Sequence, residues 1–407
     1  MNELRLFLPC AAGAEGFLAD AVARITGRAR DDLQVARAGV LVRGGWTDAL
    51  RLNLHSRLAQ RVLVQLSHTA YRSEADLYDA ASAVAWENWF TPRQSFKVEL
   101  TAQRSPLKSL NFAALKVKDA VADRFRTRGG VRPDVDTQRP DVRLFVHLTA
   151  EHCTLYIDTS GEPLFKRGWR QDTGEAPLKE TLAAAMVAAS GWDASVPLYD
   201  PCCGSGTIAI EAAQIACGIA PGLQRRFAVE QMLPFEAQPW SQLKEEARAL
   251  QHVPGAPVFG SDVAFRMVDF AQRNAQRAGV AHALQLRGGD ALQRPPPSDV
   301  PGVLLVNPPY GERIETAGVA GRTQRGRERA DVAEGGDFFA QLAAHWKKHY
   351  AGWAAWVLTP DLKLPSRMRL KESRRVPMWN GPIECRLFRF DMVAGSARTK
   401  DDAAPGA

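Results

Sequence analysis

The feature that most constrains the fold is an alternation of strand-like and helix-like segments that begins near residue 177. Short apolar runs bounded by turn residues predict strands, and the longer segments between them repeat apolar residues with helical spacing. The strand-like runs are "VPLYD", "APVFGSD", "ALQLRGGDAL", "GVLLVNPPY", "AAWVLTP" and "IECRLFRFDM", the last expected to close the sheet. This alternation predicts a parallel, doubly wound sheet, interrupted by a long insertion at about 218–255.

The first 160 residues have a different pattern, made of shorter α+β units. Strands are expected at 4–9, 142–149 and 153–160, and helices at 110–128 and in "TDALRLNLHSRLA", which Thr47 would cap. No cluster of residues in this half suggests catalysis, so we interpret it as a platform. A chain of 407 residues is too long for one ordinary core, which favours two or three domains.

Composition excludes several classes of protein. Apolar residues make up 45% and charged residues 24%, as in a globular protein, and no apolar run approaches the roughly 20 residues that span a bilayer. The N-terminus lacks the pattern of a secretory signal, and the six cysteines show no zinc-site spacing, so a cytoplasmic location without a membrane partner is expected. The net charge of +7 favours a polyanionic partner.

A glycine-rich turn, "GSGTIA" at 204–209, follows the first strand of the second half and opens a helix. It satisfies the G-x-G-x-x-G/A pattern of dinucleotide sites, in which glycines let the backbone approach a ligand. By itself the turn leaves three alternatives: NAD, another adenosine cofactor, or a purely structural turn.

Three carboxylates follow successive strands and favour one of these alternatives. Asp200 precedes the glycines, where it would repel a pyrophosphate but attract an ammonium or sulfonium group. Asp262 could accept hydrogen bonds from a ribose diol, and Asp290 from an adenine amino group. Each could instead be a helix N-cap, but the three together describe S-adenosylmethionine better than NAD. A hydride-transfer enzyme would also need a general acid, and the sequence offers no persuasive candidate.

The stretch "NPPYGERI" at 307–314 ends the fourth strand of this half. Proline cannot donate to a sheet ladder, so the strand must stop, and two prolines make a rigid corner between Asn307 and Tyr310. Such a corner suits a flat, polar ligand.

Together, "DPCCGSGTIAIEAA", "GSDVAFRMVDFAQRNAQRAG" and "NPPYGERI" resemble motifs of the class I methyltransferases that act on exocyclic amino groups of bases. The resemblance implies that Asn307, Pro308, Pro309 and Tyr310 form the catalytic corner. The Asn307 side-chain oxygen and the Pro308 carbonyl would each accept one N–H of the target amine, and Tyr310 would stack on the base. The target base must then be flipped out of a duplex or already single-stranded.

Further segments, among them "FKRGWR", "LRLNLHSR" and "FAALKVKDAVADRF", resemble the bacterial THUMP-containing RNA methyltransferases, and within them the large-subunit ribosomal RNA guanine-N2 enzymes. The resemblance implies a ferredoxin-like domain at 1–65, a THUMP domain at 66–160, a linker at 161–176 and a Rossmann-like methyltransferase domain at 177–392, with a disordered tail at 393–407. Some relatives carry a second methyltransferase domain, and any second modification that such relatives make is not assigned to this chain.

The resulting expectation is methyl transfer from S-adenosylmethionine to guanine N2 in RNA, with 23S ribosomal RNA as the partner and no metal. The sequence does not determine the oligomeric state, for which a monomer is the default. The alternatives are a tRNA guanine-N2 or an adenine-N6 methyltransferase, and a non-catalytic RNA-binding assembly factor. The expected cofactor-binding residues are Asp200, Cys202, Gly204, Ser205, Gly206, Thr207, Asp262, Val263, Asp290 and Ala291. The expected RNA-binding residues are Lys108, Lys116, Lys118, Arg124, Lys166, Arg167, Arg170, Arg322 and Arg325.

Overall fold

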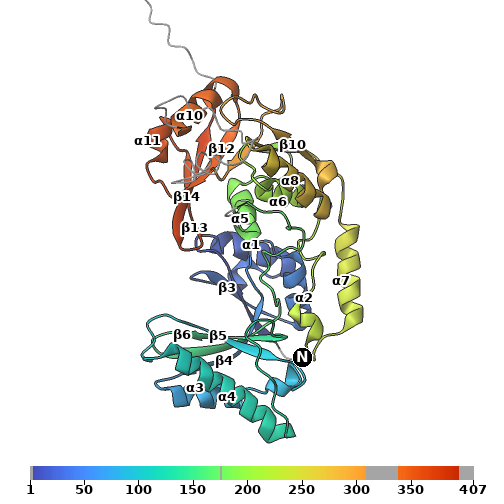
Figure 1. Cartoon of the computed structure of the whole chain (residues 1–407), viewed down its shortest axis with the longest axis vertical. Helices are drawn as coiled ribbons and strands as arrows, with labels where there is room; N and C mark the ends of the chain where they lie inside the picture. The colour runs from blue at the N-terminus through green and yellow to red at the C-terminus, as the bar shows by residue number, and fades with distance from the viewer. Residues whose placement is uncertain (1–2, 175–176, 309–337, 394–407) are drawn as a thin grey trace, which may run out of the picture.

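The computed structural model describes residues 3–174, 177–308 and 338–393. The molecule is elongated, with a platform sheet and two helices at one end and the second sheet at the other (Figure 1). In the described part of the chain no helix is both long and apolar enough to cross a membrane. The expected catalytic residues Pro309 and Tyr310, the expected RNA-binding residues Arg322 and Arg325, and all of the expected tail but its first residue lie outside the described residues.

The first half is built on one seven-stranded sheet in the order β2-β3-β1-β4-β7-β6-β5. Its strands are β1 (Leu4–Pro9), β2 (Gln34–Ala36), β3 (Gly39–Gly44), β4 (Leu63–Ala70), β5 (Phe96–Ala102), β6 (Val142–Leu148) and β7 (His152–Asp158). All neighbours are antiparallel except β5 and β6. Strand β4 pairs with β1 on one side and with β7 on the other, so the two N-terminal units share a sheet, and the expected boundary between residues 65 and 66 falls inside this strand.

Four helices accompany this sheet: α1 (Glu15–Thr26), α2 (Trp46–His55), α3 (Glu74–Ala83) and α4 (Leu110–Gly129). Helices α3 and α4 lie side by side on one face of the platform (Figure 1). Along β6 the residues alternate between buried and half-buried, as in a strand with one face on the core. Helix α2 begins at Trp46 with Gly45 as its N-cap, whose N–H donates to the Asp48 carboxylate at 2.8 Å. The expectation that Thr47 caps this helix is therefore wrong.

The second half contains a seven-stranded sheet in the order β10-β9-β8-β11-β12-β14-β13. Its strands are β8 (Leu198–Asp200), β9 (Val258–Asp262), β10 (Leu284–Gly288), β11 (Val303–Val306), β12 (Ala354–Thr359), β13 (Arg374–Asn380) and β14 (Ile383–Asp391). The first five in this order are parallel, and β14 is antiparallel to both of its neighbours. Among the described residues, the α-helices of this half are α5 (Glu180–Ser190), α6 (Thr207–Ala216), α7 (Ala237–Ala249), α8 (Phe265–Arg277), α10 (Phe338–His349) and α11 (Leu364–Met368).

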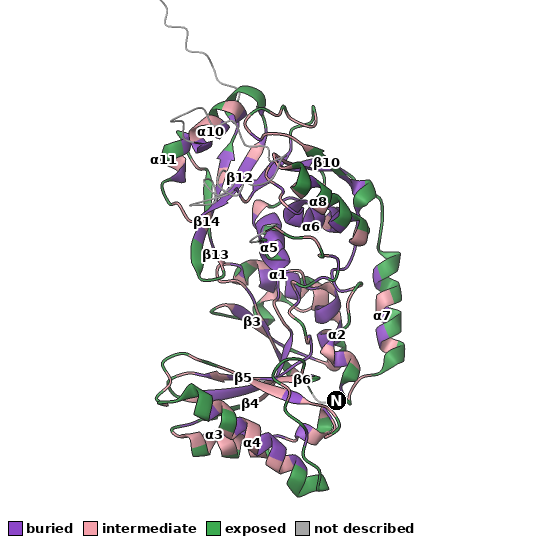
Figure 2. Cartoon of the chain, in the orientation of Figure 1, coloured by how far each residue is buried: buried purple, intermediate pink, exposed green. Residues whose placement is uncertain are grey.

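Sequence patterns missed two elements of this half. Strand β13, and not β14, forms the edge of the sheet. It was missed because its alternation is interrupted by Pro377 and by exposed arginines. Helix α7 lies within the long insertion and is largely exposed on its outer side, with Trp240 among its buried residues (Figure 2).

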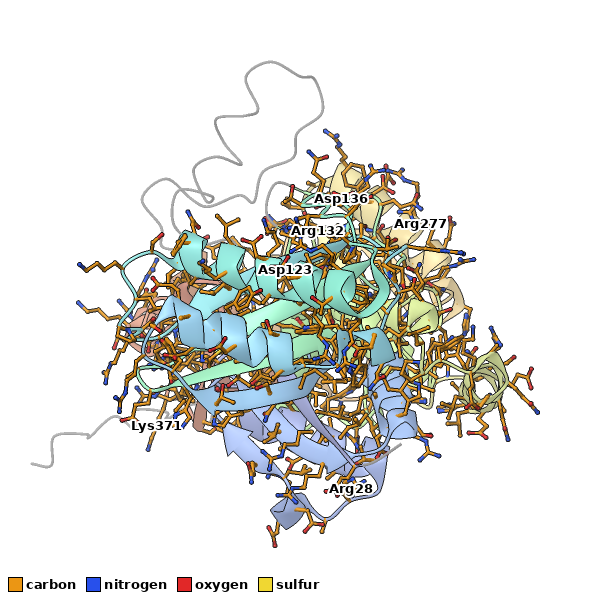
Figure 3. The ribbon with its side chains drawn as sticks, turned by 90° about the horizontal axis from the view of Figure 1, so that it is seen from below. Arg28, Asp123, Arg132, Asp136, Arg277 and Lys371 are labelled. Atoms are coloured by element: carbon orange, nitrogen blue, oxygen red, sulfur yellow. The ribbon has the colours of Figure 1, made fainter. Side chains whose placement is uncertain are left out.

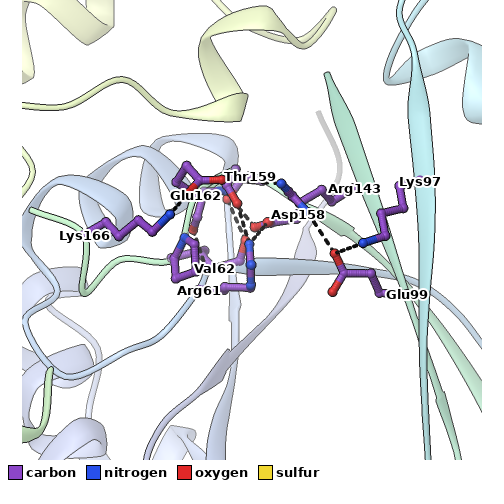
Figure 4. A network of polar contacts seen from close by, with 12 residues as sticks. Arg61, Val62, Lys97, Glu99, Arg143, Asp158, Thr159, Glu162 and Lys166 are labelled. Carbon is purple, nitrogen blue, oxygen red and sulfur yellow. Dashed lines mark hydrogen bonds and ion pairs between the residues drawn. The ribbon is translucent and has the colours of Figure 1, made fainter. Parts of the chain in front are cut away.

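The two halves are joined by buried polar contacts. Arg57, which follows α2, and Arg167 of the linker both pair with the fully buried Glu211 of α6, at 3.2 and 3.0 Å. A second network centres on Arg61, which contacts the buried Asp158 carboxylate at the end of β7 and lies beside Arg143 and Glu162 (Figure 4). Because a buried charge needs a partner, these ion pairs hold the platform, the linker and the second sheet in a defined arrangement.

Candidate functional site

The candidate site lies where the order of the second sheet reverses. Strand β8 is central, with β9 on one side and β11 on the other, so the chain leaves β8 in one direction and later returns on its other side. Loops at the carboxyl ends of β8 and β11 therefore diverge and leave a crevice, which is the usual ligand site of such sheets. Asp200 ends β8, and Asn307 directly follows β11.

The glycine-rich turn makes room for a ligand at this crevice. A Cβ atom added at Gly204, whose φ is +51°, would meet nothing within 4 Å, so the space beside this residue is open. At Gly206 the φ of +90° suits glycine, and an added Cβ would lie 3.0 Å from the Ala271 side chain of α8. The second glycine thus allows close packing of the turn on α8, and the first leaves open space beside a half-buried stretch of backbone.

Hydrogen bonds from outside the turn hold it in place. The fully buried Asn274 of α8 donates to the carbonyl of Ser205 at 3.0 Å. Arg170 of the linker donates to the Ser205 hydroxyl at 3.1 Å and to the Thr207 hydroxyl at 2.8 Å. Its Nε donates to Glu180 of α5 at 2.7 Å, so one guanidinium joins the linker, α5 and the turn. The sequence pattern did not identify Asn274 or this function of Arg170, because both contacts are distant in sequence.

Asp200 is buried at the end of β8, where its Oδ1 accepts the N–H of Cys202 at 3.1 Å. The pKa of this carboxyl is raised from 3.8 to about 8, chiefly by burial and in smaller part by the neighbouring Asp262 carboxylate, while the Cys202 N–H lowers it. A cationic group placed beside Asp200 would relieve this unfavourable ionisation. The structure therefore fits an ammonium- or sulfonium-bearing ligand at this end of the crevice.

The other two carboxylates also lie at this edge of the sheet. Asp262 ends β9, and its two oxygens accept the N–H groups of Gly204 and Ala264, both at 2.9 Å, while burial raises its pKa. Each oxygen keeps a second lone pair that could accept a ribose hydroxyl. Asp290 lies two residues beyond the end of β10, where its Oδ1 accepts the N–H of Leu292 at 2.9 Å. The expectation that Asp290 ends the strand itself is wrong by these two residues.

A further aromatic residue lies beside the Asp262 loop. Phe265, the first residue of α8, is 57% exposed. A Cβ added at Gly288, the last residue of β10, would lie 2.3 Å from its ring, so the ring covers that glycine. An exposed ring between the ends of β9 and β10 offers a stacking surface for an adenine. The only sequence signal for it was a phenylalanine three residues after Asp262.

Asn307 combines burial with an unused acceptor. Its Oδ1 atom is buried and, within the described chain, accepts no hydrogen bond. Because leaving a buried polar atom unpaired costs about 1–3 kcal/mol, such an atom calls for a specific explanation. Pro308, which follows it, is also buried.

Several expected RNA-binding residues are engaged elsewhere in the structure. Arg167 is only 2% exposed and pairs with Glu211, and Arg170 forms the hydrogen bonds to Glu180, Ser205 and Thr207 that hold the glycine-rich turn. Arg124 forms two hydrogen bonds with Glu87, at 2.8 and 2.6 Å, and is 13% exposed. An RNA contact by these three would have to break existing ion pairs, and their expected role in RNA binding stays a prediction.

The other basic residues of the first half remain accessible to different degrees. Lys108 is exposed, Lys116 lies 5.3 Å from the centre of the Phe112 ring, and Lys118 pairs with Asp119. Figure 3 looks onto this helical side of the molecule, where acidic side chains such as Asp123 are mixed with basic ones. Lys166, the remaining described residue of the RNA-binding prediction, is 59% exposed.

Comparison with known protein families agrees with this geometry. The family model described as "RMKL-like, methyltransferase domain" matches residues 167–389, more than half of the chain. This chain belongs to the RMKL-like methyltransferase family. The THUMP domain model matches residues 71–158, and the RlmL ferredoxin-like domain model matches residues 5–63. The expected fold class and family are thus confirmed, with ferredoxin-like and THUMP domains before a Rossmann-like methyltransferase domain.

Curated relatives of this RMKL-like protein are named ribosomal RNA large subunit methyltransferase K/L. The relative from Shewanella loihica is 38% identical over 376 residues, which cover 91% of this chain and 51% of the relative. The one from Aeromonas hydrophila is 34% identical over 425 residues, covering 98% of this chain and 56% of the relative. The chain therefore spans about half the length of these relatives.

Solved structures show the same architecture. One, described as a predicted N6-adenine-specific DNA methylase from Listeria monocytogenes, is 28% identical with a TM-score of 0.81, covering 96% of each chain. Another, a methyltransferase complexed with SAH, is 25% identical with a TM-score of 0.82, covering 96% of this chain and 98% of that one. The expectation of S-adenosylmethionine as the cofactor of this RMKL-like protein is confirmed at the level of the family.

Proposed function

We propose that this chain transfers a methyl group from S-adenosylmethionine to the exocyclic N2 amino group of a guanine in large-subunit ribosomal RNA. The observation that supports this most directly is the buried, unpaired Oδ1 of Asn307 at the reversal of the sheet. An amino group of a base would supply the hydrogen bond that this oxygen lacks. The names of the curated relatives support ribosomal RNA as the substrate class.

The residues of the chain would act by positioning. The cofactor supplies an electrophilic methyl group when bound. Asp200 would hold its cationic end and Asp262 its ribose, and the open space at Gly204 would let the cofactor approach the backbone closely. Asn307 Oδ1 and the Pro308 carbonyl would accept the two N–H groups of the target amine. Both bonds draw the nitrogen lone pair out of conjugation with the ring and direct it toward the methyl group, and such orientation can lower a barrier by several kcal/mol.

The expected stacking by Tyr310 remains a prediction, because that residue lies outside the described chain. The same corner could hold the N6 amino group of adenine, and the description of the Listeria structure favours that second candidate. The guanine-N2 and adenine-N6 candidates differ in the methylated base that is recovered and not in the role of Asn307.

The test uses the purified chain, S-adenosylmethionine labelled in its methyl group, and RNA from a strain deleted for the gene, followed by mass spectrometry of the nucleosides. We expect N2-methylguanosine in large-subunit RNA. Label in tRNA or in methyladenosine would overturn the substrate and keep the mechanism.

Asn307→Ala should lower turnover by about a hundredfold or more, because one of the two acceptors that orient the amine is removed, while cofactor binding stays near wild type. The exposed Asn88→Ala provides the matched control. Substantial turnover by the Asn307 variant would refute its assigned role.

A further inference from the structure

Two cavities lie along the junction between the platform and the catalytic sheet. The larger, of about 640 Å³, is lined by linker residues 162–170, by 177–180 at the start of α5, and by Arg225 and Arg226 of the insertion. The smaller, of about 160 Å³, lies between residues 10–12 of the first domain, α5, and the turn between β13 and β14. Lys179 lines both cavities, so they adjoin at this residue.

The larger cavity carries an excess of positive charge. Its lining includes two carboxylates, and each already has a basic partner: Glu162 pairs with Lys166, and Glu180 with Arg170. Its basic residues are Lys166, Arg167, Arg170, Lys179, Arg225 and Arg226. Arg226 and Lys179 are exposed, so their charged groups can reach a ligand in the cavity.

Arg225 forms a fixed part of this wall. Its guanidinium donates to the backbone carbonyls of Glu162 at 2.6 Å and Pro163 at 2.7 Å, and to those of Ser160 and Lys166 at 3.2 and 3.0 Å. Carbonyl oxygens carry no net charge, so these bonds immobilise the guanidinium without neutralising it. The cavity is therefore backed by a rigid cation, which suits a fixed anion such as a phosphodiester.

Flat apolar surfaces accompany these charges. In the larger cavity the Lys179 ammonium lies 5.1 Å from the centre of the Phe165 ring. In the smaller cavity Trp379, at the end of β13, is half-buried and lies 6.0 Å from the Arg386 guanidinium. Cations alternating with aromatic rings are typical of surfaces that bind single-stranded nucleic acid.

The cavities also adjoin the candidate active site. Arg170 lines the larger cavity and donates to the hydroxyls of Ser205 and Thr207 in the glycine-rich turn. We infer that the two cavities form one track for a single-stranded RNA segment, whose phosphates contact Lys179 and Arg226 and whose bases stack on Phe165 and Trp379. The inference rests on the proposed function, since it places the strand that carries the target nucleotide.

The experiment compares the full chain with the double variant Lys179→Glu/Arg226→Glu, measuring binding of a fluorescent single-stranded RNA by anisotropy at several salt concentrations. We expect the Kd to rise at least tenfold and the slope of log K against log salt to fall by about 1.4, or about 0.7 for each phosphate that is no longer neutralised. The control is Arg248→Glu/Lys348→Glu, two exposed residues of α7 and α10 with the same change in charge. An unchanged Kd and slope in the track variant would overturn the inference, as would an equal effect in the control.

Two further measurements separate the possible failures. If the double variant unfolds early in a thermal scan, Lys179→Gln/Arg226→Gln replaces it, with about half the change in charge and an expected rise in Kd of at least threefold. If a duplex RNA of the same length binds as tightly as the single strand, and the variants weaken its binding equally, the single-strand assignment is overturned. RNA that binds through the track but is never methylated would refute the proposed function alone, whereas methylation with an unchanged KM for RNA in the variants would refute the track alone.

Discussion

Replacing Asp200 with asparagine should stabilise the ligand-free protein at alkaline pH while weakening its hold on the cofactor. Asp200 is buried and its pKa is raised from 3.8 to about 8, so the folded state holds a proton that the unfolded state releases. A carboxyl whose pKa is raised on folding makes the folded state less stable as the pH rises from the unfolded value toward the folded one. Asparagine imitates the protonated carboxyl and has no such dependence.

The size of the effect follows from the pKa. Between pH 5 and pH 8 the unfolded carboxyl is ionised and the folded one largely protonated, so the wild type should lose about 1.4 kcal/mol per pH unit relative to Asp200→Asn. Over three units the difference approaches about 4 kcal/mol, and at about 2 °C per kcal/mol the gap in Tm should widen by about 8 °C. Near pH 5, about one unit above the unfolded pKa, the two proteins should already differ by about 1.5 kcal/mol, or about 3 °C.

The assay is a thermal unfolding scan at pH 5, 6, 7 and 8 without ligand, paired with calorimetric titration of S-adenosylmethionine at pH 8. The exposed Asp299→Asn serves as the control for removing a charge elsewhere. Asp200→Asn should bind the cofactor at least tenfold more weakly, because it offers the cationic end no negative partner. A gap in Tm that stays constant across this range would refute the raised pKa, and unchanged cofactor affinity would move the cationic end of the ligand away from Asp200.

Two other substitutions probe the contacts around the site. Arg170→Lys keeps the charge but cannot form hydrogen bonds to Glu180 and to both hydroxyls of the turn at the same time. The Kd for the cofactor, measured by calorimetry, should therefore rise several-fold. A selective loss of RNA binding would instead support a surface role for this residue. Glu211→Gln removes the buried negative partner of Arg57 and Arg167 and should lower the free energy of unfolding by about 3–5 kcal/mol. The exposed Glu245→Gln should have little effect. Equal melting temperatures of the two variants would show that the junction does not depend on this ion pair.

The elements of the catalytic sheet were predictable because each carries its own local signal. Strands β8, β9 and β11 are short apolar runs that end in a polar residue or before a proline, and their carboxyl ends meet at one edge whatever the details of packing. Strand β13 was missed because an edge strand with a proline and exposed arginines has no such signal.

The contacts of the site residues depend on pairings that the sequence does not show. As basic residues in basic segments, Arg124, Arg167 and Arg170 look alike in the sequence. In the structure they pair with Glu87, Glu211 and Glu180. The first two partners are distant in sequence, and Glu180 is ten residues from Arg170. Which cations remain free for a ligand depends on these tertiary pairings. The aromatic cover given by Phe265 likewise depends on the packing of α8 over the end of β10.

The sharing of β4 between the two N-terminal units has a mechanical consequence. A hinge between these units would have to break the hydrogen bonds that β4 makes with β1 or with β7, so the whole sheet moves as one body. With the ion pairs of Glu211 at its other end, this body sets a fixed separation between any RNA feature docked on the platform and Asn307. In an enzyme of the proposed kind the platform would serve as a ruler, which selects the target nucleotide by its distance from the docked feature and not by the bases around it.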